Sequence, residues 1–235
     1  MIIGHIGARK GSKGVPGKNF RDVCGKPLID WSLDQLFQCE RVDVVVVSTD
    51  SEEMYEHAIA RGTLDIGLRP AHLANDTAAK WNVWEHALEE VEKQTGPASV
   101  FMDLDCTSPL REAQDIENAL DLFFAEQPDM VMTCAEARTN PYFNLLETDE
   151  TGALHVSKPL PNGVVARQQA PMVYQHAAST YIMAADYIKR ANALFEGRVL
   201  PSVVPASRSQ DIDEEIDFQV VKFLMEERLK QQSAS

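Results

Sequence analysis

Short apolar runs alternate with amphipathic segments along the first 135 residues. The apolar runs are bounded by turn or helix signals, as is typical of buried strands, and cover residues 1–8, 42–49, 99–105 and 130–134. Between them, apolar residues recur at helical spacing in 27–39, 51–61, 78–93 and 114–126. This alternation predicts an α/β fold in which a mostly parallel sheet carries helices on both faces.

The pattern changes between about residues 135 and 175, where pairs such as Asn140-Pro141 and Ala170-Pro171 interrupt short alternating stretches. Such a segment predicts strands and hairpins, for example at 153–157. We interpret 135–175 as an insertion, within a single domain of residues 1–235, that covers the site or pairs two subunits.

Beyond this insertion the core pattern resumes. Residues 179–183 and 199–204 have the composition of buried strands, and a helix is expected at about 214–230. An apolar stripe is expected to pack this helix on the domain, and its residues are Ile216, Val220, Phe223 and Leu224.

The composition indicates one large domain that needs no disulfide bonds. The chain has 235 residues, of which 44% are hydrophobic. Its 4 cysteines and 6 histidines lack the spacing of a zinc site. The N-terminal residues do not resemble a signal peptide, and no apolar run is long enough to cross a bilayer. We therefore expect a cytoplasmic protein with reduced cysteines and no membrane partner.

The net charge of −14 argues against nucleic acid as a partner, because binding to its phosphate backbone calls for a basic face. Residues 1–26 differ from the rest, since they hold 6 basic residues and only one acid, Asp22. This contrast predicts a local site for a small polyanion.

A glycine-rich basic loop follows the first expected strand, from Ala8 to Asn19. Gly11, Gly14 and Gly17 allow backbone N–H groups to approach phosphate oxygens, and the basic side chains neutralise a triphosphate. The glycine spacing matches neither the Walker loop nor the GxGxxG fingerprint, which weakens the ATP and NAD hypotheses. Taken alone, a loop of this composition is equally compatible with a plain turn.

This loop begins an ordered series of motifs: Arg9-Lys10-Gly11-Ser12-Lys13-Gly14, Pro16-Gly17-Lys18-Asn19, Ser48-Thr49-Asp50-Ser51, Leu68-Arg69-Pro70, Leu73-Ala74-Asn75-Asp76-Thr77, Thr107-Ser108-Pro109-Leu110-Arg111, Arg167-Gln168 and Asp211-Ile212-Asp213. The series resembles the acylneuraminate cytidylyltransferases, the CMP-sialic acid synthetases, over nearly the whole chain. The resemblance implies a Rossmann-like three-layer nucleotidyltransferase fold. It also implies transfer of CMP from CTP to the anomeric hydroxyl of a nine-carbon 2-keto sugar acid, with release of pyrophosphate.

The resemblance further implies roles for individual residues. Those around CTP are Ala8, Arg9, Gly11, Ser12, Lys13, Lys18, Asn19, Arg69 and Asp76, with Arg69 near the cytosine. Those on the sugar acid are Asp105, Arg167, Gln168 and Tyr181. Arg9, Lys18 and Asp211 are the implied catalytic residues. Taken alone, Arg69 or Arg167 is more often a surface ion-pair residue, although a guanidinium suits the carboxylate of a keto acid.

Asp211 and Asp213 lie two residues apart in a segment expected to be extended, so both can point to one side. Paired carboxylates with substrate phosphate oxygens and water suit Mg²⁺, and the family pattern favours this cofactor. The alternative is that Asp213 is the N-cap of the last helix, where Glu214 and Glu215 favour the helix dipole. The two roles are compatible.

The departures from the family pattern lie on the expected sugar side. Asp105 stands where the family has glutamine, and Ala177-Ala178 where it has Asn-Gly. An acid beside an anionic substrate is unfavourable unless it binds metal, accepts from sugar hydroxyls or meets an amino substituent. We therefore hypothesise a relative of sialic acid, such as a legionaminic-like acid.

Other activities stay open on the sequence alone. One alternative is a nucleotidyltransferase of the same fold that activates the eight-carbon acid Kdo or a sugar 1-phosphate. Another is a nucleotide-binding protein without catalytic activity. The insertion resembles the family's dimerisation segment, which implies a homodimer in which Arg167 reaches the partner's site.

Overall fold

A computed structural model describes residues 1–11, 14–75 and 77–233. The main sheet of these residues consists of β1 (Ile2–Gly7), β4 (Val44–Ser48), β5 (Val100–Leu104), β6 (Met130–Glu136), β9 (Tyr174–Ala184) and β10 (Val199–Val203). The α-helices are α1 (Leu28–Gln38), α2 (Glu52–Ala60), α3 (Lys80–Thr95), α4 (Ala113–Glu126), α5 (Ala185–Arg190) and α6 (Glu215–Ser233). Short elements complete the chain: the hairpins β2 (Asp22–Val23) with β3 (Lys26–Pro27) and β7 (Leu146–Thr148) with β8 (Leu154–Val156), and the 3-10 turns η1 (Lys18–Phe20), η2 (Ala71–Leu73), η3 (Arg167–Gln169) and η4 (Ala206–Arg208).

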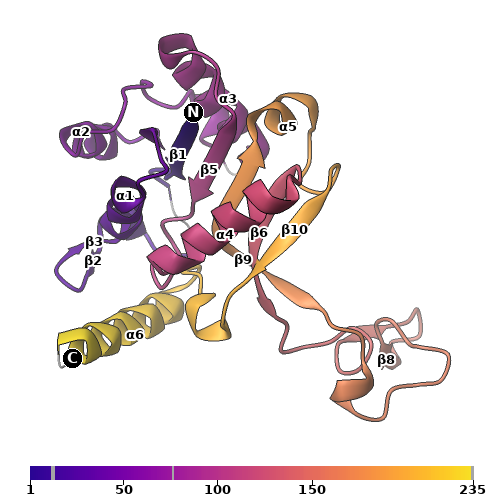
Figure 1. The fold of residues 1–235 in the computed structure, drawn as a ribbon. Coiled ribbons are helices and arrows are strands. Elements are labelled where there is room, and N and C mark those ends of the chain that lie inside the picture. Colours follow the sequence, from indigo (N-terminus) through magenta and orange to yellow (C-terminus); the bar gives the residue numbers. More distant parts are fainter. Residues whose placement is uncertain (12–13, 76, 234–235) are drawn as a thin grey trace.

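The main sheet has the order β10-β6-β9-β5-β1-β4 (Figure 1). Strands β10, β6, β5, β1 and β4 are parallel, and β9 runs antiparallel between β5 and β6. The expected α/β fold with a mostly parallel sheet is confirmed. The antiparallel strand arises because the chain leaves the sheet at the end of β6 and returns beside that strand as β9.

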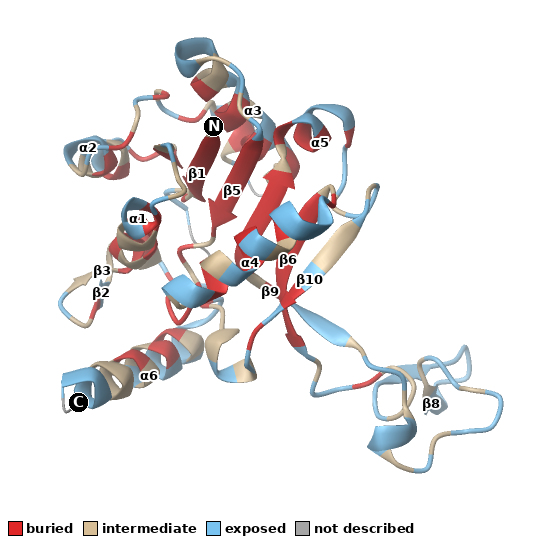
Figure 2. Ribbon diagram, viewed as in Figure 1, coloured by how far each residue is buried: buried red, intermediate tan, exposed pale blue. Residues whose placement is uncertain are grey.

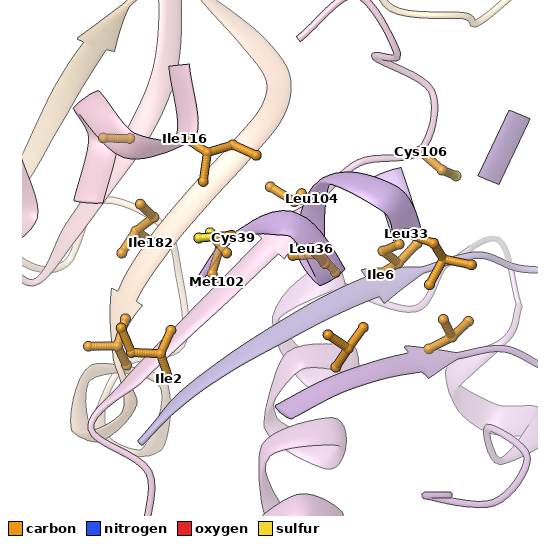
Figure 3. Close-up of a cluster of buried hydrophobic side chains, with 14 of the residues drawn as sticks. Ile2, Ile6, Leu33, Leu36, Cys39, Met102, Leu104, Cys106, Ile116 and Ile182 are labelled. Atoms are coloured by element: carbon orange, nitrogen blue, oxygen red, sulfur yellow. The ribbon is translucent and has the colours of Figure 1, made fainter. Parts of the chain in front are cut away.

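Helices cover the sheet on both faces because side chains alternate along each strand. Ile2 and Ile6 of β1 pack with α1, α2 and α4 on one face, which Figure 3 shows in part. Ile3 of the same strand packs with α3 and α5 on the other face. The second face is the important one for function, since His5, two residues after Ile3 on β1, also points to it.

Helix α6 packs through a different face from the one that its sequence indicated. Phe218, Val221 and Met225 are buried against the β2–β3 hairpin and Ile212. Ile216, Val220 and Phe223 are exposed, and only Leu224 of the expected stripe is partly buried. The expectation was wrong because α6 has apolar residues at helical spacing on both sides, and spacing alone does not say which side meets the domain.

Residues 137–173, which we call the arm, project from the body of the molecule (Figure 1). The arm contains the β7–β8 hairpin and is mostly exposed (Figure 2). Exposed apolar side chains on it include those of Leu154, Val165 and Met172. The segment expected to be an insertion thus has hairpin structure but little core of its own.

Candidate active site

Three adjoining cavities lie at the edge of the sheet where β1, β4 and β5 end. Cavity A has a volume of about 310 Å³ and is lined by His5, Gly7, Arg9, Arg69, Leu73, Asn75, Ala78, Lys80, Val83, Trp84 and Asp105. Cavity B, of about 230 Å³, shares Gly7, Arg9 and Asp105 with it and adds Gly14, Lys18, Asn19, Cys106, Thr107 and Asp213. Cavity C, of about 480 Å³, shares Asp213 with cavity B and adds Asp211, Asp217 and His176 among others. The carboxyl ends of parallel strands are where α/β folds of this type bind ligands.

The glycine-rich loop contacts the C-terminal carboxylate segment directly. A Cβ at Gly14 would lie 1.8 Å from the Asp213 carbonyl oxygen, so a residue with a side chain does not fit there. The Lys18 ammonium donates to the Ile212 carbonyl at 2.6 Å. Gly17 has φ 66°, a left-handed conformation that favours glycine. The loop is therefore more than a plain turn, because its glycines and Lys18 bring it against residues 212–213.

Several nucleotide residues expected from the family pattern lie around cavities A and B. Arg9 and Lys18 line cavity B together with the buried amide of Asn19, which accepts from the Cys106 thiol at 3.2 Å. Ala8 is buried and donates its N–H to Ser48, and Gly11 is exposed. Ser12, Lys13 and Asp76 lie outside the described residues.

Arg69 is a buried residue of cavity A and not a surface ion-pair residue. Only 8% of it is exposed, and its Nε donates to Ser48 Oγ at 2.9 Å. Burial lowers the pKa of its guanidinium from the ordinary value. A buried guanidinium bordering a cavity is a strong donor for the acceptor atoms of a ligand.

A row of polar residues crosses the sheet beneath helix α3. His5 of β1 pairs with Asp103 of β5, and Asp103 pairs with Tyr181 of β9, so all three side chains share one face. His5 Nδ1 lies 2.6 Å from Asp103 Oδ1, with both side chains fully buried. Lys80 of α3 lies 2.9 Å from Asp103 Oδ2, and its ammonium lies 4.2 Å from the centre of the Tyr181 ring. We call these four residues the polar row.

Lys80 also pairs with Asp105, the residue that departs from the family pattern. Its ammonium lies 2.7 and 2.6 Å from the two carboxylate oxygens of Asp105. Burial alone would lower the pKa of Lys80, but the charges of Asp103 and Asp105 outweigh burial and hold that pKa above its ordinary value. Burial alone would raise the pKa of Asp103, but Lys80 and His5 keep it below its ordinary value. Of the three conditions that would favour an acid at position 105, the protein itself supplies an amino group, that of Lys80.

The two carboxylates expected to bind metal line the same cavity, C. Burial raises the pKa of Asp211, and the nearby charges of Asp105 and Asp213 raise it further. A cation would relieve this crowding of negative charge. Among the described residues no group of three or more His, Cys, Asp or Glu side chains is arranged as a metal site. A pair of carboxylates fits Mg²⁺, which takes its other ligands from phosphate and water.

The alternative role of Asp213 as a helix N-cap is not what the structure has. Helix α6 begins at Glu215, and the carboxylate that accepts backbone N–H groups at this end belongs to Asp217. Asp217 takes the N–H of Asp213 at 3.1 Å and that of Glu214 at 2.7 Å. Asp213 is instead a lining residue of cavities B and C.

The residues expected on the sugar acid are not all brought together within one chain. Asp105 borders cavities A and B, whereas Arg167 and Gln168 line cavity D of the arm, of about 290 Å³. Arg167 donates to the Ala137 carbonyl at 2.6 Å. Tyr181 is 3% exposed, and its hydroxyl lies 2.8 Å from His176 Nε2. Tyr181 thus belongs to the polar row, with its hydroxyl directed at a residue of cavity C.

A comparison with family models matches residues 3–199 to the Cytidylyltransferase model. The chain belongs to the cytidylyltransferase family. Among similar proteins is the Post-translational flagellin modification protein B of Campylobacter coli, 36% identical over 97% of this chain and 96% of that protein. The CMP-N,N'-diacetyllegionaminic acid synthase of Campylobacter jejuni is 36% identical over 95% of this chain and 94% of that protein.

A solved structure shares the fold of this cytidylyltransferase. It is a CMP:2-keto-3-deoxy-manno-octonic acid synthetase in complex with CTP, with a TM-score of 0.70 and 18% identity over 97% of this chain and 99% of that one. The resemblance drawn from the motifs is confirmed, as is the nucleotidyltransferase fold. No helix among the described residues has the length and apolar character needed to cross a membrane.

His5, Lys80 and Asp103 are the site residues that the sequence analysis missed. His5 and Asp103 are polar residues inside runs that otherwise read as buried strands. A charged residue in a buried strand requires a partner, so these two residues could have been recognised from the sequence as candidates for a buried polar site. Lys80 had no comparable signal, because it is the first residue of an amphipathic helix where a lysine is ordinarily solvated.

Proposed function

We propose that the chain transfers CMP from CTP to the anomeric hydroxyl of a nine-carbon 2-keto sugar acid and releases pyrophosphate. The observation that carries this proposal is the continuity of cavities A, B and C, which share residues from the buried Arg69 to the paired Asp211 and Asp213. Arg69 lines cavity A, Arg9 and Lys18 line cavity B, and Asp211 lines cavity C. Such an order suits a nucleotide whose base, triphosphate and metal occupy successive positions.

The reaction needs no covalent intermediate with the protein. The anomeric hydroxyl attacks the α-phosphorus in line, the bond to the pyrophosphate breaks, and the hydroxyl proton leaves to a base. Arg69 binds the base end, and Arg9 and Lys18 hold the phosphates and neutralise charge that develops on the leaving pyrophosphate. Bound Mg²⁺ would supply further neutralisation of phosphate charge. Asp211 and Asp213 are the residues that would hold it.

We propose a legionaminic-like acid as the sugar substrate in preference to N-acetylneuraminate. The relative from C. jejuni, which carries legionaminic acid in its name, supports this choice. Such a product is the activated form that a later glycosyl transfer to a surface glycan would consume. The described residues include four free cysteines, in keeping with the cytoplasmic location that we propose.

Pyrophosphate release from CTP and a panel of keto sugar acids tests the proposal. We expect release with a legionaminic-like acid, a smaller kcat/KM with N-acetylneuraminate and with Kdo, and none without a divalent cation. A clear preference for N-acetylneuraminate would refute the sugar assignment. Absence of release with every acid would refute the catalytic function and leave a nucleotide-binding protein.

Substitution of Asp211 tests the metal assignment. Asp211→Asn should lose activity at limiting magnesium and regain part of it at high magnesium, because one ligand charge is missing. Asp186→Asn is the matched control, since Asp186 is an exposed carboxylate in the first turn of α5 and lines none of cavities A to D. Full activity of Asp211→Asn at limiting magnesium would exclude the metal role.

We propose that the arm pairs two copies of the chain and brings Arg167 to the partner's site. Its exposed apolar side chains and the separation of cavity D from cavity B support a homodimer. Light scattering that finds only a monomer at working concentrations would disprove this arrangement.

A further inference from the structure

His5, a residue that lines cavity A, has a ring nitrogen without a hydrogen-bond partner among the described residues. The residue is completely buried on β1, and Nε2 has no hydrogen-bond partner within the described part of the chain. His5 nevertheless lines cavity A. A buried polar atom without a partner is costly, and at the wall of a cavity a ligand can supply the missing bond.

Asp103 determines which kind of bond His5 Nε2 can make. The Asp103 carboxylate accepts hydrogen bonds only, so the nitrogen 2.6 Å away, Nδ1, carries the hydrogen. In the neutral ring with this tautomer, Nε2 is an acceptor. Lys80 keeps Asp103 ionised through its contact with Oδ2, and thereby keeps the tautomer fixed.

Gly7 lies between His5 and Arg69 in cavity A, and its lack of a side chain leaves space between them. A Cβ at Gly7 would lie 3.3 Å from His5 Cε1, the ring atom bonded to Nε2, and 3.5 Å from a terminal nitrogen of Arg69. The imidazole acceptor and the guanidinium donors are therefore close to one another at one wall of the cavity. Leu73, Val83 and Trp84 supply apolar surface in the same cavity. A flat heterocycle with one donor edge and one acceptor edge suits these groups.

We propose that His5 Nε2 accepts a hydrogen bond from the exocyclic amino group of cytosine and so makes the site select CTP over UTP. The inference rests on the proposed function, in which CTP is the nucleotide. Arg69 donates to the acceptor atoms of the same ring. Uracil has a carbonyl oxygen where cytosine has the amino group, so two acceptors would face each other. A site built to pair with a donor rejects an analogue that lacks it. His5 is thus a specificity residue, and Asp103 is its positioning residue.

Equilibrium binding of CTP and UTP, measured by calorimetry without any sugar acid, tests the proposal. In His5→Asn the amide nitrogen can replace Nδ1 as donor to Asp103, but nothing replaces Nε2. We expect its Kd for CTP to rise about tenfold and its preference for CTP over UTP to fall about tenfold or more. His5→Gln is the matched variant, because its longer side chain can place an acceptor near the position of Nε2 and should keep part of the preference.

Three results would overturn the proposal. One is a folded His5→Asn, by its Tm, that keeps the full preference for CTP over UTP. A second is a variant that instead loses its preference for CTP over 2'-deoxyCTP, which would assign His5 to the ribose. The third result comes from the wild-type protein and so does not depend on the folding of a variant. In nitrogen-15 NMR spectra, we expect the His5 Nε2 signal to shift when CTP is added and not when UTP is added. Absence of that shift contradicts the proposal.

These binding measurements separate the inference from the proposed function. A wild-type protein that binds CTP selectively but releases no pyrophosphate with any sugar acid refutes the proposed function and leaves the role of His5 standing. A protein that forms the CMP sugar while His5→Asn keeps its nucleotide preference refutes the role of His5 alone.

Discussion

The sheet edge and the arm hold their charged residues in opposite ways. At the sheet edge, Asp103 is fully buried and has both His5 and Lys80 within contact distance. On the arm, Arg167 and Gln168 are exposed, and the neighbouring apolar side chains have little to pack against. The buried charges of the first region have their partners within one chain, whereas the second region exposes both its charged and its apolar side chains.

This difference separates the two substrates of the proposed reaction. Arg9, Lys18 and Arg69, the described cations assigned to the nucleotide, line cavities bordered by strands and helices of one body, so their geometry is present before any ligand binds. Arg167 and Gln168 lie on the exposed arm, which has little core of its own. We therefore expect nucleotide binding to survive changes in oligomeric state, and sugar binding to depend on that state.

The largest effect should come from removal of Lys80. Lys80→Met leaves the carboxylates of Asp103 and Asp105 without their cation, and breaking a buried pair costs roughly 3–5 kcal/mol. The Lys80 side chain is 38% exposed, so we expect about 3 kcal/mol in the free energy of unfolding. Urea denaturation gives this value.

Lys189→Met is the control for Lys80→Met. Lys189 pairs with Glu92 at 2.8 Å on the surface, where loss of an ion pair costs about 1 kcal/mol or less. If both variants lose the same small amount of unfolding free energy, the contacts of Lys80 stabilise the fold no more than a surface ion pair does.

Arg167→Ala tests whether the arm acts on the sugar acid. Loss of hydrogen bonds to a charged group costs about 1.5–3 kcal/mol, so KM for the sugar acid should rise by about 10- to 100-fold. KM for CTP should stay unchanged. Lys158→Ala, at another exposed basic residue of the arm, is the control.

Mixed dimers show in which chain Arg167 acts. Coexpression of Arg9→Ala with Arg167→Ala should restore activity, because one site of the mixed dimer then receives both arginines. No restoration would mean that Arg167 acts within its own chain.

Gly7→Ala should have a smaller effect, confined to the nucleotide. The added methyl group would lie 3.3 Å from His5 Cε1, a tight contact at the wall of cavity A. We expect about a fivefold rise in KM for CTP, in the range of a mild overpacking, with KM for the sugar acid unchanged. A rise in both KM values would mean that cavity A does not serve the nucleotide alone.

The smallest effect concerns pH and the arm. The Thr151 hydroxyl and backbone N–H groups of residues 151–153 hold the pKa of Asp149 below its ordinary value. The hydrogen bonds of this turn are therefore present above about pH 4 and are lost as pH falls through the lowered pKa. The amide signals of Thr151 and Ala153 should follow this titration in NMR spectra. Asp149→Asn should abolish the titration, whereas a persistent one would assign it to another group.

The parts that were predictable from sequence are those set by local patterns. The strand and helix alternation follows from short stretches of sequence, and the structure has it. The contact of Gly14 and Lys18 with residues 212–213 agrees with a glycine-rich basic loop that does more than turn the chain. The packing side of α6 was not predictable, because Ile216 and Phe218 both belong to plausible apolar stripes and the choice depends on the β2–β3 hairpin.

The missed part of the site depends on contacts between distant residues. His5 and Asp103 are 98 positions apart and meet only because β1 and β5 are neighbours in a particular register. Lys80 and Asp105 are 25 positions apart and meet only because α3 lies over β5. The motifs indicated that Asp105 is unusual, but its pairing with Lys80 could be found only from the three-dimensional structure.

The pairing of Lys80 with Asp105 changes how related sequences should be compared. An acidic residue at position 105, considered alone, suggests a site with one more negative charge. Considered with residue 80, part of that charge is offset by the lysine, which Asp105 shares with Asp103. When relatives are sorted by sugar preference, the residues at positions 80 and 105 should therefore be compared as a pair. A substrate inferred from only one of these two positions would be inferred from the wrong local charge.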